Sequence, residues 1–335
     1  MDSVLQRSQI GLEAAGSRGA AVAATKTVEG NAMWGPPNIG RSNVEEIAQG
    51  KGSYFAQYAH VTNTREAAGQ WNDVATFDDL PMQLLMAMRG DVAPVALTVP
   101  VGATPAYDWD FLQPGRVDNN RSATFEFFDG RDWWQIPYAL IQSWTLSGAP
   151  NQPVRFTATL IGRDRTLLGG GGTPGLPDRL SREITIFESA QMWVNGPGQN
   201  IGGTLLAADV VEFELTGGNS YNPRRFGTSG KTYKSVSKGK RQMGMRLTLD
   251  YSDRLEYDRF IGGDAGKFRL LISGSAIGNS GYNRELLLDT YGPYSGLELP
   301  DRDGALVGVH TLMPEYDATA GTDVRVRVRN GSNTP

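Results

Sequence analysis

Residues 133–148 read WWQIPYALIQSWTLSG, and after a five-residue turn the chain continues as VRFTATLIGRDR over residues 154–165. Both stretches are rich in β-branched and aromatic residues and are bounded by Gly, Pro or Asn, as strands are. Around Trp144 apolar and polar residues alternate, which is the period of a strand with one buried face. The two stretches therefore predict an antiparallel hairpin.

The same signal recurs on both sides of this hairpin. A chain of 335 residues with 42 glycines and 18 prolines suits many short strands joined by turns. In the last expected strand Arg325, Arg327 and Arg329 alternate with valines, and we expect their face to be solvated or subunit-facing rather than a phosphate site. The other expected strands are TFEFFDG (124–130), EITIFES (183–189), QMWVNG (191–196), ADVVEFELTG (208–217), MRLTLDYS (245–252), KFRLLISGSA (267–276), NRELLLDTYG (283–292), ALVGVHTLMP (305–314) and DVRVRVRNG (323–331). The sequence thus predicts a mainly β protein with a few short helices.

One segment carries a clear helix signal. In FDDLPMQLLMAMRG (77–90) Pro81 suits a first helical turn, Thr76 or Asp78 can cap it, and Gly90 ends it. The leucines and the last methionine form one apolar stripe. This pattern predicts a short amphipathic helix whose stripe fills a core.

The stretch LLGGGGTPGLPD interrupts the strand signal and predicts a domain boundary. The chain before it begins with Gly, Ala, Ser and Thr in weak periodicity. We expect an extended N-terminal arm with loops over 1–75 and a first β unit over 76–166. A Gly/Pro linker over 167–181 then leads to a second β unit over 182–335, which contains a long basic loop over 217–242.

Each half of the chain holds a hairpin of the same face pattern. ALIQSWTLSG aligns with DVVEFELTG, and VRFTATLIGRDR aligns with MRLTLDYSDR. This repeat predicts a duplicated β-sandwich. The core face is expected to carry Trp144, Phe213, Leu247 and Leu249. The polar positions expected on one shared face are Ser143, Thr145, Arg155, Thr157, Thr159, Glu212, Glu214, Arg246, Thr248 and Asp250.

The sequence lacks the residues that several kinds of catalytic and metal-binding site require. The chain has no cysteine and only two histidines, His60 and His310, so thiolate metal sites, cysteine nucleophiles and histidine zinc triads are unsupported. Paired acids such as Asp301 and Asp303 lie in turns, and the tetraglycine from Gly169 lacks the Lys-Ser/Thr of a phosphate-binding loop. No apolar run approaches the ~20 residues of a membrane span. We therefore predict no enzyme, no cofactor, no metal site and no membrane partner.

Charge is divided unevenly along the chain. The basic loop carries seven basic residues and no acid, and removing them from the net charge of −4 leaves −11 on the remainder. Such a body repels nucleic acid and offers acidic surface to the basic loop of another copy. We expect the loop to be mobile in the free subunit and to become ordered on a neighbour. Its interleaved tyrosines also leave single-stranded nucleic acid as an alternative. The basic residues are Arg224, Arg225, Lys231, Lys234, Lys238, Lys240 and Arg241.

The order of these segments resembles the tail tube protein, or major tail protein, of long-tailed bacteriophages. SQIGLEAAGSRGAAVAATK (8–26) looks like the N-terminal segment of one group of these proteins, and FDDLPMQLLMAMRG resembles their early helix. TFEFFDG and FTATLIGRD (156–164) resemble their central strands, and DGALVGVHTLMPEYD through RVRVRN (303–330) resembles their closing strands. The resemblance covers most of the chain and rests on order and spacing, with no catalytic fingerprint.

This resemblance implies a structural virion protein. Its β-sandwich hairpins would join across subunits into a closed barrel, and stacked rings would form a hollow tail tube. Genome DNA would pass along an acidic lumen without specific binding. The ten polar positions would face that lumen, and the basic loop would contact the next ring. The implied partners are further copies of the chain, the tape-measure protein, and tail terminator or tip proteins, in a virion whose parts are made in the host cytoplasm. A duplicated chain is similar to tube proteins with trimeric, pseudo-sixfold rings, so a trimer is favoured over a hexamer.

Two other classes stay open from the sequence. A carbohydrate-binding β-sandwich of a virion or cell-surface fibre would use exposed tryptophans, for which Trp34, Trp71, Trp109, Trp133 and Trp134 are candidates. A β-type glycoside hydrolase would need two carboxylates on either side of a sugar bond. Because adjacent residues of a strand point to opposite faces, only one residue of the double tryptophan is expected to be exposed.

Overall fold

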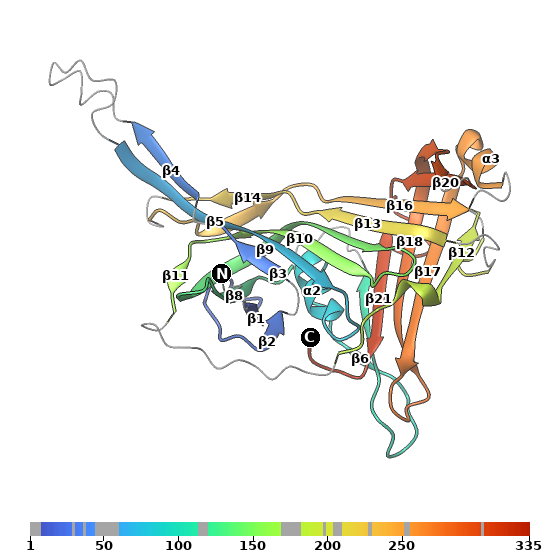
Figure 1. Ribbon diagram of the computed structural model, residues 1–335, viewed down its shortest axis with the longest axis horizontal. Helices are drawn as coiled ribbons and strands as arrows, with labels where there is room; N and C mark the ends of the chain where they lie inside the picture. The colour runs from blue at the N-terminus through green and yellow to red at the C-terminus, as the bar shows by residue number, and fades with distance from the viewer. Residues whose placement is uncertain are drawn as a thin grey trace.

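The structure is a computed structural model of the 335-residue chain. It describes residues 8–28, 31–35, 38–43, 60–112, 120–168, 182–196, 199–203, 210–226, 230–250, 255–302 and 305–335. Strands dominate the described residues, which include two α-helices, and this confirms the mainly β, sandwich-like class (Figure 1).

The chain up to Leu168 forms a first set of elements. They are β1 (Ser8–Leu12), β2 (Lys26–Val28), β3 (Asn31–Trp34), β4 (Asn38–Asn43), β5 (His60–Val74), α2 (Leu80–Ala87), β6 (Val95–Ala96), β7 (Tyr107–Leu112), β8 (Ala123–Phe128), β9 (Trp133–Gly148), β10 (Arg155–Gly162) and β11 (Thr166–Leu167). The described part of 1–75 thus contributes five strands rather than an arm of loops. In β5 small and polar residues occupy many positions, so its period-2 pattern is weak although Ala67, Trp71 and Asp73 all point inward.

The chain from Arg182 forms a second set. It comprises η2 (Phe187–Ser189), β12 (Ala190–Asn195), β13 (Val210–Gly218), β14 (Tyr221–Arg224), β15 (Ser235–Lys238), β16 (Gln242–Asp250), α3 (Leu255–Gly262), β17 (Ala265–Ala276), β18 (Asn283–Glu298), β19 (Asp301–Arg302), β20 (Ala305–Leu312) and β21 (Val324–Asn330). The strand expected at EITIFES is instead two isolated bridges, at Ile184 and Ile186, followed by the 3-10 turn. Of the linker expected over 167–181, residues 169–181 lie outside the described residues.

One long antiparallel sheet runs through the molecule. Its order is β3-β5-β10-β9-β13-β16-β20-β18, where β18 takes part with its C-terminal end. The hairpins expected from the sequence, β9–β10 and β13–β16, lie edge to edge in it, because Phe213 of β13 pairs opposite Gly148 of β9 (Figure 1). We refer to this array as the long sheet.

Two outer sheets complete the layers. The first has the order β2-β1-β8-β9-β11 and the second β12-β17-β18-β21-β7-β6. β9 and β18 each have 16 residues and pass from an outer sheet into the long sheet. Near these passages Tyr138 has φ 57° and Gly292 has φ 154°. A Cβ at Gly292 would lie 2.2 Å from the Met313 carbonyl oxygen, so only glycine fits there.

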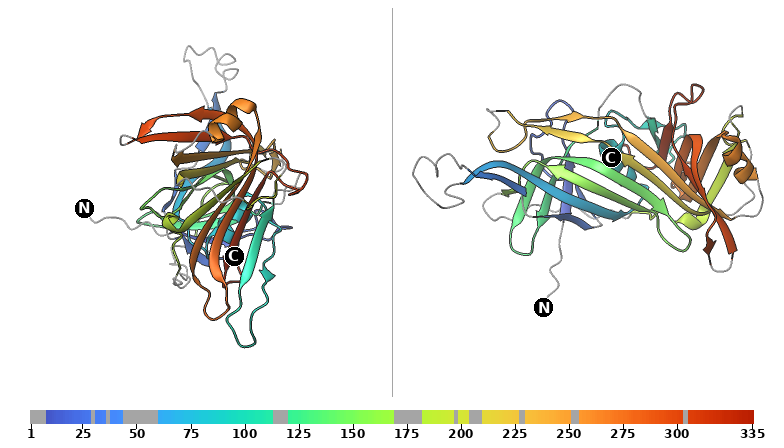
Figure 2. Two further views of the ribbon diagram at one scale, coloured as in Figure 1. Left: turned by 90° about the vertical axis from the view of Figure 1, so that its right-hand side faces the viewer. Right: turned by 90° about the horizontal axis from the view of Figure 1, so that it is seen from above.

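The two sets of elements have the same topology. In chain order β1, β3, β5, α2, β8, β9, β10 and β11 of the first correspond to β12, β13, β16, α3, β17, β18, β20 and β21 of the second, with the same pairings in each. In the right-hand view of Figure 2 most blue to green elements of the first set lie at one side and the orange and red elements of the second at the other, whereas β6 and β7 join the second set because β7 pairs with β21. Of the strands matched from the sequence, β9 and β13 are therefore neighbours, β10 and β16 lie on either side of that pair, and neither match joins counterparts. Amphipathic hairpins share a face pattern whatever their topological position.

An irregularity in both ladders supports this correspondence. The β10–β9 ladder shifts register between Thr159 and Leu160, whose partners are Ser143 and Ile141. The β20–β18 ladder shifts between Thr311 and Leu312 in the same way, with one residue of β18 passed over. A Thr-Leu pair in β10 and in β20 thus lies opposite an extra residue in β9 and in β18. Bulges are specific features of a sheet, so their recurrence indicates a duplicated unit.

The core lies between the long sheet and the outer sheets. Trp71 contacts Phe125 and Phe156 edge-on, with ring centroids 5.6 and 5.7 Å apart. All eight residues of α2 are buried, so this helix is enclosed on every side instead of being amphipathic. Within the described residues no helix is long and apolar enough to cross a membrane. The four residues expected on the core face, Trp144, Phe213, Leu247 and Leu249, are all buried.

Candidate functional site

The polar face of the long sheet brings together the ten positions singled out from the sequence. Registers place Thr157 opposite Thr145 and Thr145 opposite Thr216, while Glu214 lies between Ser147 and Arg246. Directly paired residues of neighbouring strands share a face. The ten therefore lie on one surface that crosses β10, β9, β13 and β16: Ser143, Thr145, Arg155, Thr157, Thr159, Glu212, Glu214, Arg246, Thr248 and Asp250.

Their exposure differs from that of the opposite face. Nine of the ten are half-buried or exposed, and Thr248 is 5% exposed. The residues that alternate with them, such as Leu146, Phe156 and Leu215, are fully buried. One face of these four strands thus belongs to the core, and the other is at least partly exposed at nine of the ten positions.

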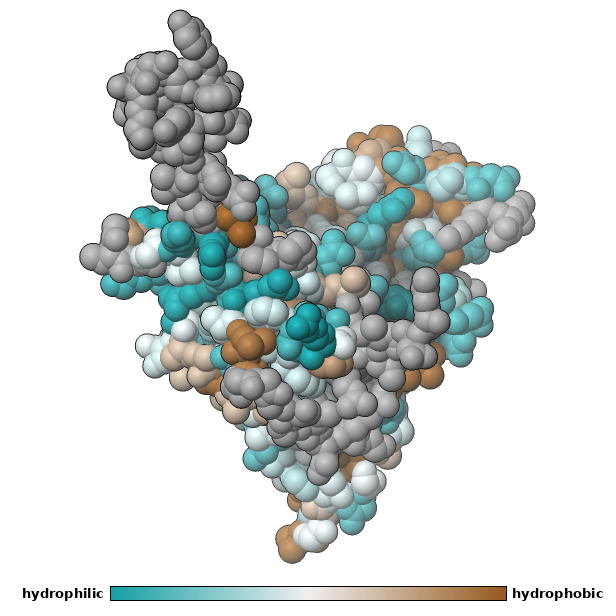
Figure 3. Space-filling view, turned by 60° about the vertical axis from the view of Figure 1, so that its left-hand side comes forward, coloured by the Kyte–Doolittle hydropathy of each residue, from teal (hydrophilic) through white to brown (hydrophobic). Residues whose placement is uncertain are grey.

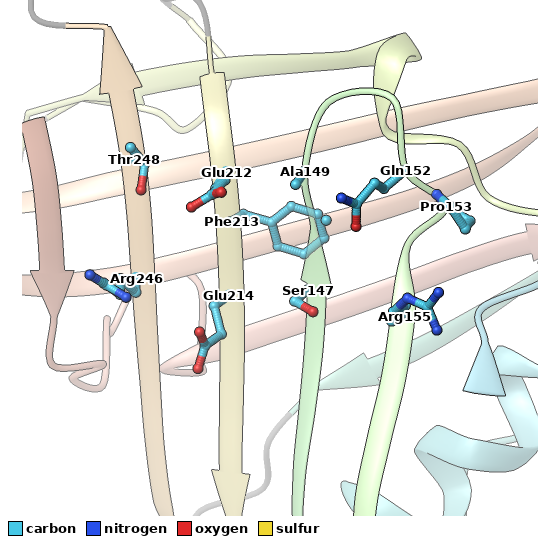
Figure 4. A pocket seen from close by; sticks show the side chains of 11 residues that line it. Ser147, Ala149, Gln152, Pro153, Arg155, Glu212, Phe213, Glu214, Arg246 and Thr248 are labelled. Atoms are coloured by element: carbon cyan, nitrogen blue, oxygen red, sulfur yellow. The ribbon is translucent and has the colours of Figure 1, made fainter. Parts of the chain in front are cut away.

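A depression on this face shows how the side chains lie. Figure 4 shows Arg246, Glu214, Ser147 and Arg155 side by side across four neighbouring strands, with the ring of Phe213 near them. The ring fits beside Gly148, where a Cβ would lie 2.5 Å from it. A glycine opposite an aromatic residue lets two strands pair closely while the ring covers the backbone. The depression is open and is lined by groups of both charges, so it has no enclosed substrate pocket.

Negative charges outnumber positive charges on this face. Among the described residues from β10 to β18, four carboxylates lie on it, against two guanidinium groups, Arg155 and Arg246. The carboxylates belong to Glu212, Glu214, Asp250 and Glu298. Hydroxyl groups occupy most of the positions between them. The surface is therefore hydrophilic and weakly acidic, with no continuous basic track on which phosphates would be held.

The acidic residues elsewhere that could suggest catalysis are engaged in structure. Asp108 and Asp110 each accept two hydrogen bonds, from Arg329 and Arg325, at 2.7 to 3.1 Å. Arg327 pairs with Glu285 at 3.1 Å, so the arginine face of β21 is neutralised by carboxylates. Burial lowers the pKa of His310 to about 4, which leaves its imidazole neutral, and the side chain of His60 lies outside the described residues. Over the described residues no group of His, Asp and Glu side chains could hold a metal ion.

The tryptophans do not form a platform. Trp34, Trp71, Trp109 and Trp133 are at most 8% exposed. Trp134 is half-buried; its indole donates to Asp129 at 2.7 Å, and Arg165 lies 4.3 Å above the ring. The double tryptophan is therefore split between core and surface, as alternation in a strand requires. The observation that favoured a sugar-binding module is thereby removed.

The sequence was compared with known protein families and with curated proteins. The family described as phage tail tube protein matches residues 13–309, which span both sets of elements. The chain belongs to this family. No curated protein matches the sequence significantly. A tail tube protein is a structural component of the virion tail.

The basic loop of this tail tube protein packs on its own chain. β14 and β15 form a hairpin, and the buried Tyr233 donates to the Tyr138 carbonyl at 2.8 Å. Arg241 donates to the Met88 carbonyl at 2.7 Å, and Arg225 forms an ion pair with Glu66. Lys238 donates to an asparagine side chain within the same chain. The described part of the loop therefore packs against its own chain, with Tyr221 and Tyr233 as an apolar anchor, where a free arm was expected from the sequence. Its exposed basic residues are Arg224, Arg225, Lys231, Lys234 and Lys240.

This loop lies near a second projection of the tail tube protein. β4 and β5 extend from the same end of the molecule, and the Arg65 amide donates to the Lys231 carbonyl at 2.8 Å. Figure 3 shows this end with a mostly hydrophilic surface and single apolar residues between the polar ones. Such a surface suits a charged partner better than an apolar one.

Sequence reasoning missed part of the polar face. Gln70 and Asn72 of β5 pair with Thr159 and Thr157, and Thr311 of β20 pairs with Arg246, so all three extend the face. The alternation in TREAAGQWND was a usable signal for β5, but its small residues weakened it. In β20 a nearly continuous apolar run hid the alternation.

Proposed function

We propose that this tail tube protein polymerises as stacked rings into the hollow tube of a phage tail, and that genome DNA is delivered through it. The observation that carries the proposal is the long sheet, with one core face, one polar face and two edges to which no other described strand is paired. An open sheet edge is a template for another strand, and closure into a barrel removes both edges.

The polar face suits a channel for DNA. A hydroxyl-rich, weakly acidic wall does not release counterions from phosphates and so does not hold the duplex. The ten polar positions are our candidates for the lumen. The exposed basic residues of the loop are candidates for contacts between rings, against the acidic remainder of another copy.

A ring of three chains fits the duplicated sheet best. Each chain supplies eight strands to the long sheet, so three copies supply 24. At a strand spacing of about 4.8 Å and a tilt of about 40°, such a barrel is about 48 Å across between opposite backbones. Six copies would make a barrel about twice as wide. We therefore favour the trimer over the hexamer.

The remaining parts of the proposal follow from this role. The protein acts without catalysis or cofactor, is made in the host cytoplasm, and contacts the tape-measure protein inside the tube and terminator or tip proteins at its ends. Electron microscopy of the purified protein tests the central claim. We expect tubes with an axial channel and threefold rings. Protein that remains monomeric at all concentrations would contradict the tube, and rings of six whole chains would contradict the trimer.

A further inference from the structure

The long sheet consists of four strands from the first half of the chain, β3-β5-β10-β9, followed by four from the second half, β13-β16-β20-β18. We call the place where these two groups pair the internal junction. β9, the last strand of the first group, pairs with β13, the first strand of the second. The same two positions are open at the ends of the sheet. β3 is the counterpart of β13 and pairs only with β5 among the described strands of the long sheet, and the C-terminal end of β18 is the counterpart of β9.

We propose that the C-terminal end of β18 pairs with β3 of a second copy in the way that β9 pairs with β13. The chain then carries an internal copy of its own subunit contact. This inference rests on the proposed function and adds which strands, in which register, form the contact. Transferring the register of β9–β13 places Trp34 opposite Leu299 and Gly35 opposite Glu298, where the internal junction has Leu215 opposite Leu146 and Thr216 opposite Thr145.

Backbone hydrogen bonds agree with this register. The Asn219 amide donates to the Gln142 carbonyl, so the odd-numbered residues of β13 face β9. The Gly35 amide donates to β5, which leaves the amide and carbonyl of Trp34 at the free edge. The Val307 amide donates to the Pro300 carbonyl, so Leu299 faces the other edge of β18. The backbone groups of Trp34 and Leu299 are thus at the edges where the register needs them.

Exposure distinguishes the internal junction from its open counterpart. Leu146 is fully buried beside β13, whereas its counterpart Leu299 is 38% exposed. Met86 of α2 is fully buried, whereas Ile261, at the same position of the eight-residue helix α3, is 65% exposed. Apolar side chains that are buried at the internal junction are therefore exposed at its open counterpart. A second copy of the chain would cover both.

At the internal junction two polar residues of the second half contact the C-terminal end of α2. In the first set, α2 ends against side chains from beyond it: Asn219 donates to the Ala87 carbonyl at 3.0 Å, and Arg241 donates to the Met88 carbonyl. These side chains donate hydrogen bonds to carbonyls that have no partner within the helix, because they lie at its end.

The same two residue types stand at the corresponding positions of the first set. Trp34 pairs with Gly69 as Leu215 pairs with Met245. Four residues after Trp34 and four before Gly69 lie Asn38 and Arg65. Four residues after Leu215 and four before Met245 lie Asn219 and Arg241. Asn38 and Arg65 are exposed in the single chain. In the assembled ring they would reach the C-terminal end of α3 of the adjacent copy.

Engineered cysteines test the register directly, since the chain has no cysteine of its own. The double variant Gly35→Cys with Glu298→Cys places both thiols in a non-hydrogen-bonded pair across the proposed contact, at a distance a disulfide spans. Its internal control is Thr145→Cys with Thr216→Cys, which forms the same pair within one chain. The off-register control is Gly35→Cys with Thr311→Cys, whose second site lies one strand farther from the edge.

After assembly and oxidation, we expect the first variant to run as covalent dimers and trimers on a non-reducing gel, with a ladder that ends at three chains. The internal control should oxidise as a monomer, and the off-register control should stay reduced. Wild-type tubes together with an internal control that oxidises and a first variant that does not would overturn the edge assignment but leave the tube intact. Wild-type protein without rings at any concentration would instead contradict the proposed function.

A second measurement avoids dependence on cysteine geometry. Asn38→Ala with Arg65→Ala should raise the protein concentration required for assembly at least tenfold and leave the melting temperature of the free subunit unchanged. Normal assembly of this variant would exclude the proposed caps on α3.

Discussion

The two halves of the chain share a topology but differ in how completely they are enclosed. α2 is buried at all eight positions, and its C-terminal end is capped by Asn219 and Arg241 of the second half. α3 occupies the same place in the second half, yet Ile261 is largely exposed. The first half is completed within the chain, whereas the second half lacks the neighbour that the first one has. Two units of the same topology therefore differ in how far their apolar side chains are covered.

A second difference concerns buried charge. The first half places Asp73 at the position where the second half has Leu249, and both side chains are almost fully buried. Near it, Asp79 pairs with Arg182 at 3.2 Å, with both side chains 3% exposed. Arg182 comes from the second half, so this pair joins the two halves beside α2. A buried ion pair costs desolvation, and removing one partner leaves an uncompensated charge.

The largest expected effect is on the internal junction. Trp144→Ala should destabilise the free subunit by about 3–5 kcal/mol, because it removes a buried ring that packs on Phe156 and beside Gly217. The matched variant Leu297→Ala, at the counterpart position of the open edge, should change stability far less and reduce assembly instead. Urea unfolding of both variants measures the difference. Equal losses of stability would mean that the two junctions are not related as described.

The next effect tests the buried acid. Burial, with the nearby Asp79, raises the pKa of Asp73 from its usual 3.8 to about 6. The folded state then binds a proton more tightly than the unfolded chain, so the cost of Asp73 is full above pH 6 and falls as the pH drops toward 4. Asp73→Asn should therefore stabilise the protein at pH 7 by at most about 3 kcal/mol and show no gain near pH 4.

Thermal unfolding of wild type and Asp73→Asn across pH 4 to 8 measures this difference. A constant gap between the two curves would exclude titration of Asp73 as its cause. Asp79→Asn serves as the contrast, since it removes the charge that pairs with Arg182 and should destabilise at neutral pH.

A smaller effect separates the two asparagines. Asn219→Ala should cost the free subunit about 1–3 kcal/mol, because it removes the buried side-chain donor of the Ile141 carbonyl and leaves the Ala87 carbonyl with Asn120 as its side-chain donor. Asn38→Ala should leave the free subunit unchanged. Calorimetry on both variants at a concentration below assembly checks this, and a loss of stability in the second would show that Asn38 already has an equivalent role within the chain.

The smallest effect is expected on the polar face. Glu212→Gln should change the free energy of unfolding by less than about 0.5 kcal/mol, as surface substitutions do. Phe213→Ala, its neighbour on the core face, should cost about 3–5 kcal/mol. Denaturant titration compares them, and a large effect of the first would place Glu212 in a buried network rather than on a channel wall.

Local patterns were sufficient for much of the fold. The mainly β class, most strand positions, and the division of Trp144, Phe213, Leu247 and Leu249 from their polar neighbours follow from period-2 alternation. That signal is local, because successive side chains of any strand point to opposite faces. It failed where the pattern was weak, as in β5, and at EITIFES, where alternation is present but only isolated bridges form.

Strand partners and the true repeat were decided by tertiary structure alone. Alternation says which face of a strand is buried but not which strand lies beside it, so β9 and β13 appeared as counterparts although they are neighbours. The basic loop likewise looked like a solvated arm, because nothing in its sequence shows that Tyr233 reaches Tyr138, 95 residues away. Contacts between distant segments depend on how the whole chain closes, and a local pattern carries no information about that closure.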